Sequence, residues 1–331
     1  MLLEVMGKAH GFILVNKGTY NRETGEGQWT RIGLNPTFKD WLVKQRLVFP
    51  NHPYGYTARP TSNPKPSLVV ISSLDDDDQR VYTAIEREFA PREQFLVEAN
   101  KRLKRLKIDI AYPDYATYLA SWNFKDGSSK LTGMIGNQLF RSFSEQDGSG
   151  GRLWGHWVQR CPKVIRPHLT FDRQPVYEGD YASMQMTLMY ALKGIEKPSG
   201  DLYDISDDIR RYWMKTILTK TIGSSSRTQA IGAIRKEMKV GSPDLMSEAE
   251  DLYEMFWNYH AVVRDLLFNG GAWKRLQLIE SEIALEVIAM LLERGIVTIP
   301  LHDSFIVKEK FADDLDEIMP LAYKKVTSEL Q

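Results

Sequence analysis

The chain has 331 residues, 43% hydrophobic and 11% aromatic, so it can bury a large core and is not an intrinsically disordered polypeptide. Its 43 Lys and Arg residues balance 43 Asp and Glu residues, so any nucleic-acid-binding surface must come from uneven distribution of charge. The single cysteine, Cys161, excludes an intramolecular disulfide and a thiolate zinc cluster, and no apolar run predicts a membrane span. These features predict a soluble, cytoplasmic protein.

The first half of the chain gives one strong pattern. Residues 81–108 have helical spacing and end in a dense basic cluster that contains Lys101, Arg102, Lys104 and Arg105. Such a cluster can contact the phosphate backbone of a nucleic acid, although a solvated helix face would look the same. We expect residues 1–110 to form an N-terminal accessory or thumb-like region that contacts nucleic acid.

The second half of the chain alternates strands and helices more regularly. A strand ends at Asp180, and an apolar run follows it. Four segments have helical patterns, namely 205–222, 226–239, 276–294 and 311–330. Between the last two, residues 295–309 predict a strand–turn–strand hairpin around His302 and Asp303. The order predicts an α+β fold over 111–331, an antiparallel sheet backed by helices, with a small helical insertion at about 203–262.

Asp180 and Asp303 are candidate catalytic acids because each lies at the end of a predicted strand. Nucleotidyl transfer with two divalent cations needs carboxylates that are distant in sequence but adjacent in space. Between them, Arg211 and Lys215 lie one helical turn apart and can bind a triphosphate. Each feature alone is more often a turn residue or a solvated helix face. Their order along the chain favours a nucleotidyltransferase.

Four segments resemble motifs of family A DNA polymerases (the bacterial DNA polymerase I type) and of the related single-subunit RNA polymerases. GDYASMQMTLMYAL (179–192) resembles the first palm motif, RYWMK (211–215) the triphosphate-binding fingers motif, and LHDSFIV (301–307) the third motif. GRLWGHWVQRCPKVIR (151–166) resembles a segment that contacts the primer and template. The resemblance covers about residues 150–310 in the family's order, and it implies a right-hand polymerase with a palm and reduced fingers.

The resemblance also implies roles for individual residues. Asp180, Asp303 and the backbone carbonyl of Tyr181 would bind two Mg²⁺ ions, for which Mn²⁺ can substitute. The triphosphate and the primer-template would be bound by two further sets of residues: Arg211, Lys215 and Gln185 for the nucleotide, and Arg152, Gln159, Arg166 and His302 for the nucleic acid.

Several positions depart from the pattern of the DNA enzymes. Gln185 replaces a glutamate that excludes a ribose hydroxyl, and Ser304 follows the second aspartate as in the RNA enzymes. Thr219 and Gly223 stand where the family has aromatic residues, so the usual platform for the templating base pair is missing or comes from elsewhere. These differences leave the choice of sugar open.

The sequence therefore favours a primer-extending DNA polymerase for replication of a plasmid or phage. The expected partners are a primed DNA template and nucleoside triphosphates, with a monomer as a plausible oligomeric state. An RNA polymerase or primase on the same palm, and a non-catalytic nucleic-acid-binding replication protein, stay open as alternatives. The sequence has no G-x-x-x-x-G-K-[ST] phosphate loop, which argues against a helicase or ATPase.

Overall fold

The structure is a computed structural model that describes residues 13–16, 31–34, 68–74, 80–85, 88–110, 136–144, 150–205, 208–267 and 272–330. The chain forms two compact units. The first comprises Met1–Pro66, Ala111–Gly136 and His156–Arg166, and the second comprises Ser67–Ile110, Asn137–Gly155 and Pro167–Gln331. In the first unit, strands β1 (Ile13–Asn16) and β2 (Arg31–Leu34) pair antiparallel. The units therefore differ from the predicted division at residue 110, because residues 67–110 belong to the second unit.

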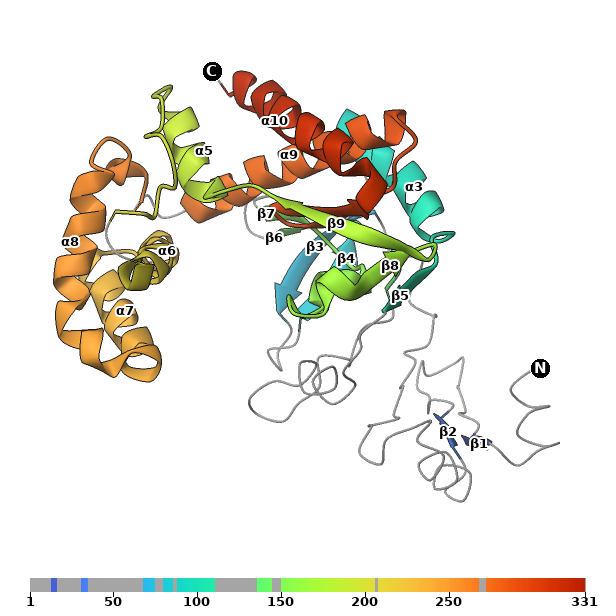
Figure 1. Cartoon of the computed structure of the whole chain (residues 1–331), viewed down its shortest axis with the longest axis horizontal. Helices are drawn as coiled ribbons and strands as arrows, with labels where there is room; N and C mark the ends of the chain where they lie inside the picture. The colour runs from blue at the N-terminus through green and yellow to red at the C-terminus, as the bar shows by residue number, and fades with distance from the viewer. Residues whose placement is uncertain are drawn as a thin grey trace. The chain divides into compact units, whose positions relative to one another are not determined.

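A five-stranded antiparallel sheet forms one part of the second unit (Figure 1). In spatial order its strands are β10 (Ile299–Leu301), β11 (Ser304–Lys308), β9 (Gln174–Asp180), β8 (Leu169–Phe171) and β5 (Ile108–Ile110). Phe305, Ile306 and Val307 of β11 are all completely buried. Such a continuous apolar run is typical of a strand that is covered on both faces.

A second sheet has four strands in the order β4 (Arg80–Ala84), β3 (Val69–Leu74), β6 (Phe140–Ser144) and β7 (Gly150–Trp154). Strands β3 and β6 run parallel, and the other neighbours pair antiparallel. The prediction of a helix from residue 81 was wrong, since β4 ends at Ala84 and helix α3 (Pro91–Leu103) begins only at Pro91. Proline is favoured in the first turn of a helix and disfavoured in its interior, which agrees with a start of α3 at Pro91.

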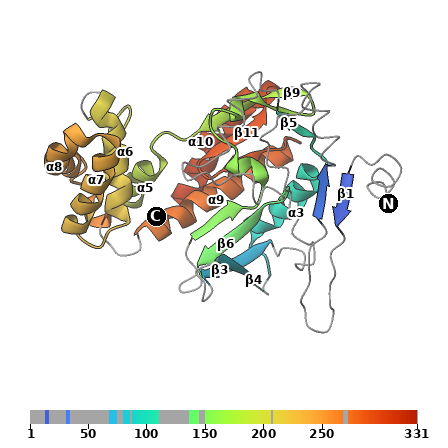
Figure 2. The ribbon, with the colours of Figure 1, turned by 90° about the horizontal axis from the view of Figure 1, so that it is seen from below.

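Helix α9 (Ala272–Glu293) lies among several elements of the second unit, as Figures 1 and 2 both show. It contacts α3, α5 (Met184–Leu192), α10 (Ala312–Ser328) and strand β7. Ile279, Ile283 and Val287, which share one face of α9 through spacings of four residues, are at most 4% exposed. Burial of this face fixes α9 against both β7 and α5, and these elements line the pocket described below.

Three further helices pack on one another at one end of the second unit (Figure 2). They are α6 (Asp208–Ile222), α7 (Arg227–Gly241) and α8 (Ala249–Tyr259). The first two match the helices predicted over 205–222 and 226–239, whereas α8 was not predicted. Trp213, Tyr253 and Phe256 form the centre of this cluster and are at most 1% exposed. Short 3₁₀ helices connect elements at Trp157–Arg160, Arg166–His168, Pro243–Glu248, Arg264–Leu266 and Glu309–Phe311.

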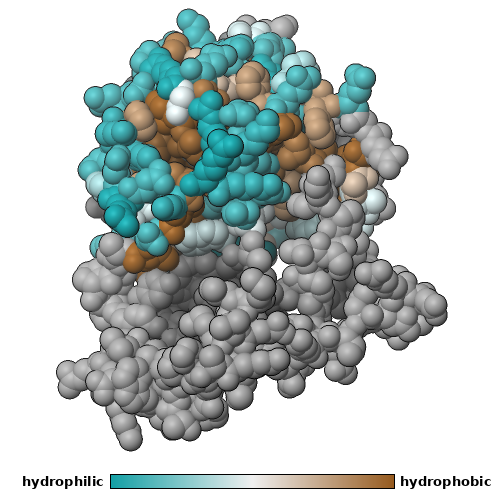
Figure 3. Space-filling view, turned by 90° about the vertical axis from the view of Figure 1, so that its right-hand side faces the viewer, coloured by the Kyte–Doolittle hydropathy of each residue, from teal (hydrophilic) through white to brown (hydrophobic). Residues whose placement is uncertain are grey.

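On the face shown in Figure 3, hydrophilic residues cover most of the coloured area, with apolar residues in smaller patches between them. None of the helices in the described residues combines the length and apolar character needed to cross a membrane.

His260 makes the folded state sensitive to acid. The ring is completely buried after α8, with Nδ1 3.0 Å from the Tyr190 hydroxyl and Nε2 3.1 Å from the Leu202 carbonyl oxygen. Burial lowers the pKa of His260 to about 4, whereas an unfolded histidine has a pKa of about 6.5. The unfolded chain therefore binds more protons between these values, and the stability conferred above pH 6.5 is lost as the pH falls towards 4.

We expect His260→Gln to reduce the pH dependence of the free energy of unfolding by up to about 3 kcal/mol between pH 7 and 4. Urea unfolding of both proteins across this range measures the difference. Equal slopes for His260→Gln and wild type would contradict the prediction.

Candidate active site

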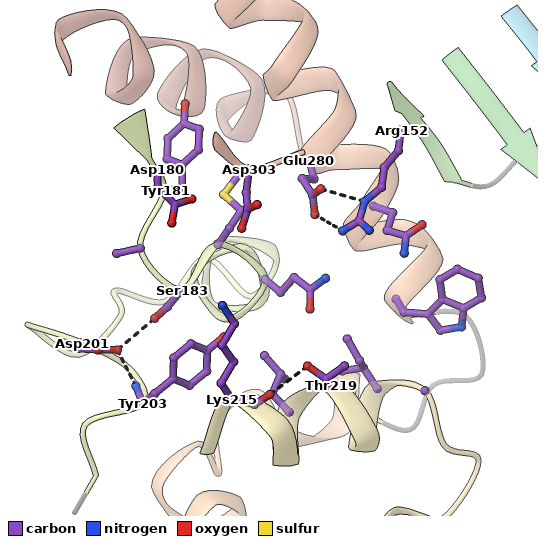
Figure 4. Close-up of a pocket in the computed structure, with 18 of the residues that line it drawn as sticks. Arg152, Asp180, Tyr181, Ser183, Asp201, Tyr203, Lys215, Thr219, Glu280 and Asp303 are labelled. Carbon is purple, nitrogen blue, oxygen red and sulfur yellow. Dashed lines mark hydrogen bonds and ion pairs between the residues drawn. The ribbon is translucent and has the colours of Figure 1, made fainter. Parts of the chain in front are cut away.

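A cavity of about 600 Å³ opens in the second unit where the ends of β9 and the β10–β11 hairpin face α5, α6 and α9 (Figure 4). It has a carboxylate-bearing side, a cationic side and a partly aromatic side. The side chains that matter for its chemistry are Arg152, Asp180, Ser183, Gln185, Asp201, Tyr203, Arg211, Lys215, Trp273, Gln277, Glu280 and Asp303. Its volume is typical of a small-molecule binding site.

Asp180 and Asp303 lie side by side although 123 positions separate them in the sequence (303 minus 180). Strand β9 ends at Asp180, which is in register with Ser304 of β11, and the Tyr181 amide donates a 3.1 Å hydrogen bond to the Asp303 carbonyl. Asp303 occupies the two-residue turn before β11, and His302 enters this turn with a φ of 69°. Figure 4 shows both carboxylates directed into the same space.

Tyr181 anchors the chain directly after Asp180. Its hydroxyl donates a 2.5 Å hydrogen bond to the Met319 carbonyl of α10, and its ring packs against Phe305 and Tyr323. Burial raises the pKa of this phenol, so the side chain stays neutral. The ring is thus held against β11 and α10, and the Tyr181 backbone is kept beside the two aspartates.

The predicted cations of α6 line the same cavity. Lys215 extends towards the aspartates in Figure 4, and Arg211 lies one turn before it on the helix. Arg211 Nε is 2.6 Å from Asp201 Oδ2. Within the described part of the chain, neither Lys215 nor Asp303 forms an ion pair. An anionic ligand can therefore bind Lys215 without displacing a protein carboxylate.

Asp201 is a site residue that the sequence analysis missed. Its Oδ1 accepts hydrogen bonds from Ser183 Oγ at 3.2 Å and from the Tyr203 amide at 3.0 Å (Figure 4). Burial opposes ionisation of Asp201, but the hydrogen bonds from Tyr203 and Arg211 outweigh it and lower its pKa. Asp201 is thus an ionised carboxylate that holds Arg211 at the rim of the cavity.

Arg152 reaches the cavity from β7 and is held by Glu280 of α9. The pair is bidentate, with Nε–Oε1 and Nη2–Oε2 distances of 2.9 and 2.8 Å (Figure 4). Glu280 is only 3% exposed, and its burial raises its pKa, which the charge of Arg152 opposes. A bidentate pair fixes the plane of the guanidinium, so Glu280 orients Arg152.

The other predicted site residues differ in where they lie. Gln185 lines the cavity, whereas His302 does not belong to its described lining and packs edge-on against Trp154 at 4.5 Å between ring centroids. Burial, with a smaller contribution from Arg152, lowers the pKa of His302 to about 4. Gln159 and Arg166 belong to the first compact unit, so their position relative to the cavity is not defined.

The basic cluster at the end of α3 contributes no residue to the described lining of the cavity. Lys101 and Arg102 lie 3.7 and 2.9 Å from carboxylate oxygens of Glu98, one turn earlier on the same helix. Lys104 and Arg105 follow the helix and are exposed. The role of these four residues in binding nucleic acid stays a prediction.

The donor atoms around Asp180 and Asp303 suit a hard divalent cation. Among the described residues, no three His, Cys, Asp or Glu side chains gather into a metal-binding group. However, Mg²⁺ is commonly held by one or two carboxylates together with water and substrate phosphates. Two carboxylates that face a cationic helix therefore fit Mg²⁺ or Mn²⁺ that binds together with a triphosphate.

No protein-family model matches this sequence, and a search of curated proteins found no match. The function proposed below therefore depends on the motifs in the sequence and on the geometry of the cavity.

Proposed function

We propose that this chain is a template-dependent nucleotidyltransferase, a compact DNA polymerase that extends a primer during replication of a plasmid or phage. The observation that carries the proposal is the meeting of Asp180 and Asp303 in one cavity with Lys215 opposite them. The hydrogen-bonded register of β9 and β11 holds the two carboxylates on rigid backbone. Rigid placement of charged groups supplies much of the stabilisation of a phosphoryl-transfer transition state.

In the proposed reaction, the primer 3′ oxygen forms a bond to the α-phosphorus of the nucleotide, and the bond from this phosphorus to pyrophosphate breaks. The hydroxyl proton passes to solvent water during the attack. Divalent cations held by Asp180 and Asp303 would lower the pKa of the hydroxyl and neutralise charge on the phosphates. Lys215 would donate hydrogen bonds to the triphosphate, and Arg211 would exchange Asp201 for a phosphate oxygen. Arg152, oriented by Glu280, would contact the primer terminus.

On this proposal the elements take the roles of a reduced right-hand polymerase. The five-stranded sheet with α9 and α10 would be the palm, and helices α6–α8 would be small fingers. The region 1–110 would be the thumb-like or accessory part, of which strands β3–β5 and helix α3 are in the second unit.

Incorporation of labelled deoxynucleotides and ribonucleotides on a primed DNA template with Mg²⁺ tests the proposal and the choice of sugar. We expect incorporation, with deoxynucleotides preferred. Ribonucleotide preference, or synthesis without a primer, would favour an RNA polymerase or primase. Two residues support this second candidate, since Gln185 lines the cavity and Ser304 follows Asp303 as in the RNA enzymes. Ser304 Oγ donates a 3.0 Å hydrogen bond to Glu178 in the structure. No incorporation of either nucleotide, with primed DNA still bound, would indicate a non-catalytic replication protein.

Lys215→Ala is expected to raise the KM for nucleotide and to lower the rate, together by about 10- to 100-fold in kcat/KM. A hydrogen bond from a charged donor to phosphate contributes about 1.5–3 kcal/mol, and little of this is recovered from water inside the cavity. Steady-state incorporation at varied nucleotide concentration measures the effect.

Lys220→Ala is a matched control on the same helix. Lys220 Nζ is 2.9 Å from Glu237 of α7, and Lys220 does not belong to the described lining of the cavity. This variant should keep wild-type kinetics. Unchanged kinetics in Lys215→Ala, or an equal loss in both variants, would argue against a role for Lys215 in nucleotide binding.

A further inference from the structure

The wall that α6 gives to the cavity changes from cationic to apolar along the helix. Arg211 and Lys215 line its first turns, and Leu218 and Ile222 line its last ones. Spacings of three and four residues keep these positions on one face of the helix. At 1.5 Å per residue the face extends about 17 Å from Arg211 to Ile222, which is long enough for a triphosphate at one end and a base at the other.

Helix α9 forms another wall, which changes from anionic at Glu280 to aromatic at Trp273. It lines the cavity at Trp273, Gln277 and Glu280, which share one helix face through spacings of four and three residues. Glu280 lies beside Asp303 in Figure 4, so this end of the α9 face is the one nearest the aspartates. Trp273 is seven residues away from Glu280, so it lies about 10 Å further along α9 from the aspartates.

The α6 face lacks an aromatic ring at its apolar end, because Leu218, Thr219 and Ile222 line the cavity there and Gly223 directly follows the helix. Trp273 is half-buried, so its indole both packs against the protein and lines the cavity. Any of the four bases can stack on an aromatic side chain, because every base has a flat π-face. Stacking therefore suits an enzyme that must accept all four nucleotides. The geometry points to Trp273 as the platform on which the base of the bound nucleotide stacks, while Lys215 holds the triphosphate.

This inference rests on the proposed function, and it assigns the base and the phosphates to separate residues. Binding of two probes separates these contributions. Deoxyadenosine triphosphate contains both parts, whereas inorganic tripolyphosphate contains only the anionic part. Isothermal titration calorimetry with Mg²⁺ measures the affinity of each probe for wild type, Trp273→Ala, Trp273→Phe and Lys215→Ala.

Trp273→Ala should weaken binding of deoxyadenosine triphosphate by about 5- to 100-fold and leave tripolyphosphate binding unchanged within about twofold. Trp273→Phe retains an aromatic face and should bind the nucleotide within about fivefold of wild type. Lys215→Ala should weaken binding of both probes. The result that supports the inference is weaker binding of the nucleotide alone in Trp273→Ala, together with weaker binding of both probes in Lys215→Ala.

Wild-type nucleotide affinity in Trp273→Ala would overturn the inference, and so would an equal loss of both probes, which indicates a structural role for the indole. Primer extension by the wild type distinguishes this failure from failure of the proposed function. An active enzyme whose nucleotide binding ignores Trp273 refutes only the stacking platform. A protein that binds nucleotide through Trp273 and extends no primer refutes only the polymerase.

Discussion

Asp180→Asn and Asp303→Asn are each expected to lower the rate of nucleotide incorporation by about three orders of magnitude or more. Each substitution keeps the size of the side chain but removes the charge that holds divalent cations beside the reacting groups. The loss of one preorganised electrostatic group typically costs about 100- to 1,000-fold, and a metal ligand serves both the attacking and the leaving oxygen. Single-turnover incorporation at saturating nucleotide measures the chemical step.

The matched control is Asp172→Asn, in the turn that precedes β9, whereas Asp180 lies at the other end of that strand. Asp172 lies in the two-residue turn between β8 and β9 with a φ of 50°, a conformation that asparagine also adopts readily. This variant should incorporate nucleotide at the wild-type rate. All three variants should bind primed DNA, because the substitutions leave the phosphate-binding cations intact. A wild-type rate in either active-site variant would contradict the assignment.

Arg141→Met is expected to reduce the free energy of unfolding by about 3–5 kcal/mol, the usual cost of removing one partner of a buried ion pair. Arg141 on β6 and Glu93 on α3 are 3% and 0% exposed in their side chains, with Nη1 3.0 Å from Oε1. The guanidinium also donates 3.0 Å hydrogen bonds to the Gly151 carbonyl and to Ser281 Oγ of α9. Arg141 thus joins α3, β7 and α9 through one side chain, and methionine can fill the space without making these bonds.

Urea unfolding followed by circular dichroism measures this loss. The control is Arg235→Met, whose guanidinium pairs with Glu250 on the surface, where the two side chains are 50% and 47% exposed. Such exposed pairs contribute about 0–1 kcal/mol, so this variant should be nearly as stable as wild type. If Arg141→Met lost no more stability than Arg235→Met, the buried contacts of Arg141 would not hold α3, β7 and α9 together.

The elements nearest the candidate site were predictable because their signals are local. The strand that ends at Asp180 and the hairpin around Asp303 combine β-branched and aromatic residues with a turn. The first forms as β9, which ends at Asp180, and the hairpin forms as β10 and β11. The helices of the insertion and α9 also follow their hydrophobic spacing. The four-stranded sheet was not predicted, because its β3–β6 pairing joins strands that are about 70 residues apart and depends on tertiary packing.

The candidate site was predictable only in part, for a related reason. Asp180, Asp303, Arg211 and Lys215 follow from motifs, and the structure brings all four to one cavity. The two carboxylates that pair with arginines of the site were missed, because nothing in the sequence pairs Asp201 with Arg211 or Glu280 with Arg152. Glu280 did carry a signal, since it is an acid next to the apolar face of α9 and must have a partner if it is buried.

Equilibrium binding of Mn²⁺, followed by electron paramagnetic resonance in the presence of a non-hydrolysable deoxynucleoside triphosphate, tests most directly whether Asp180 and Asp303 form a divalent-cation site. Wild type and Asp172→Asn should bind the ion with equal affinity, whereas Asp180→Asn and Asp303→Asn should bind it far more weakly. Wild-type Mn²⁺ affinity in both active-site variants would contradict the account.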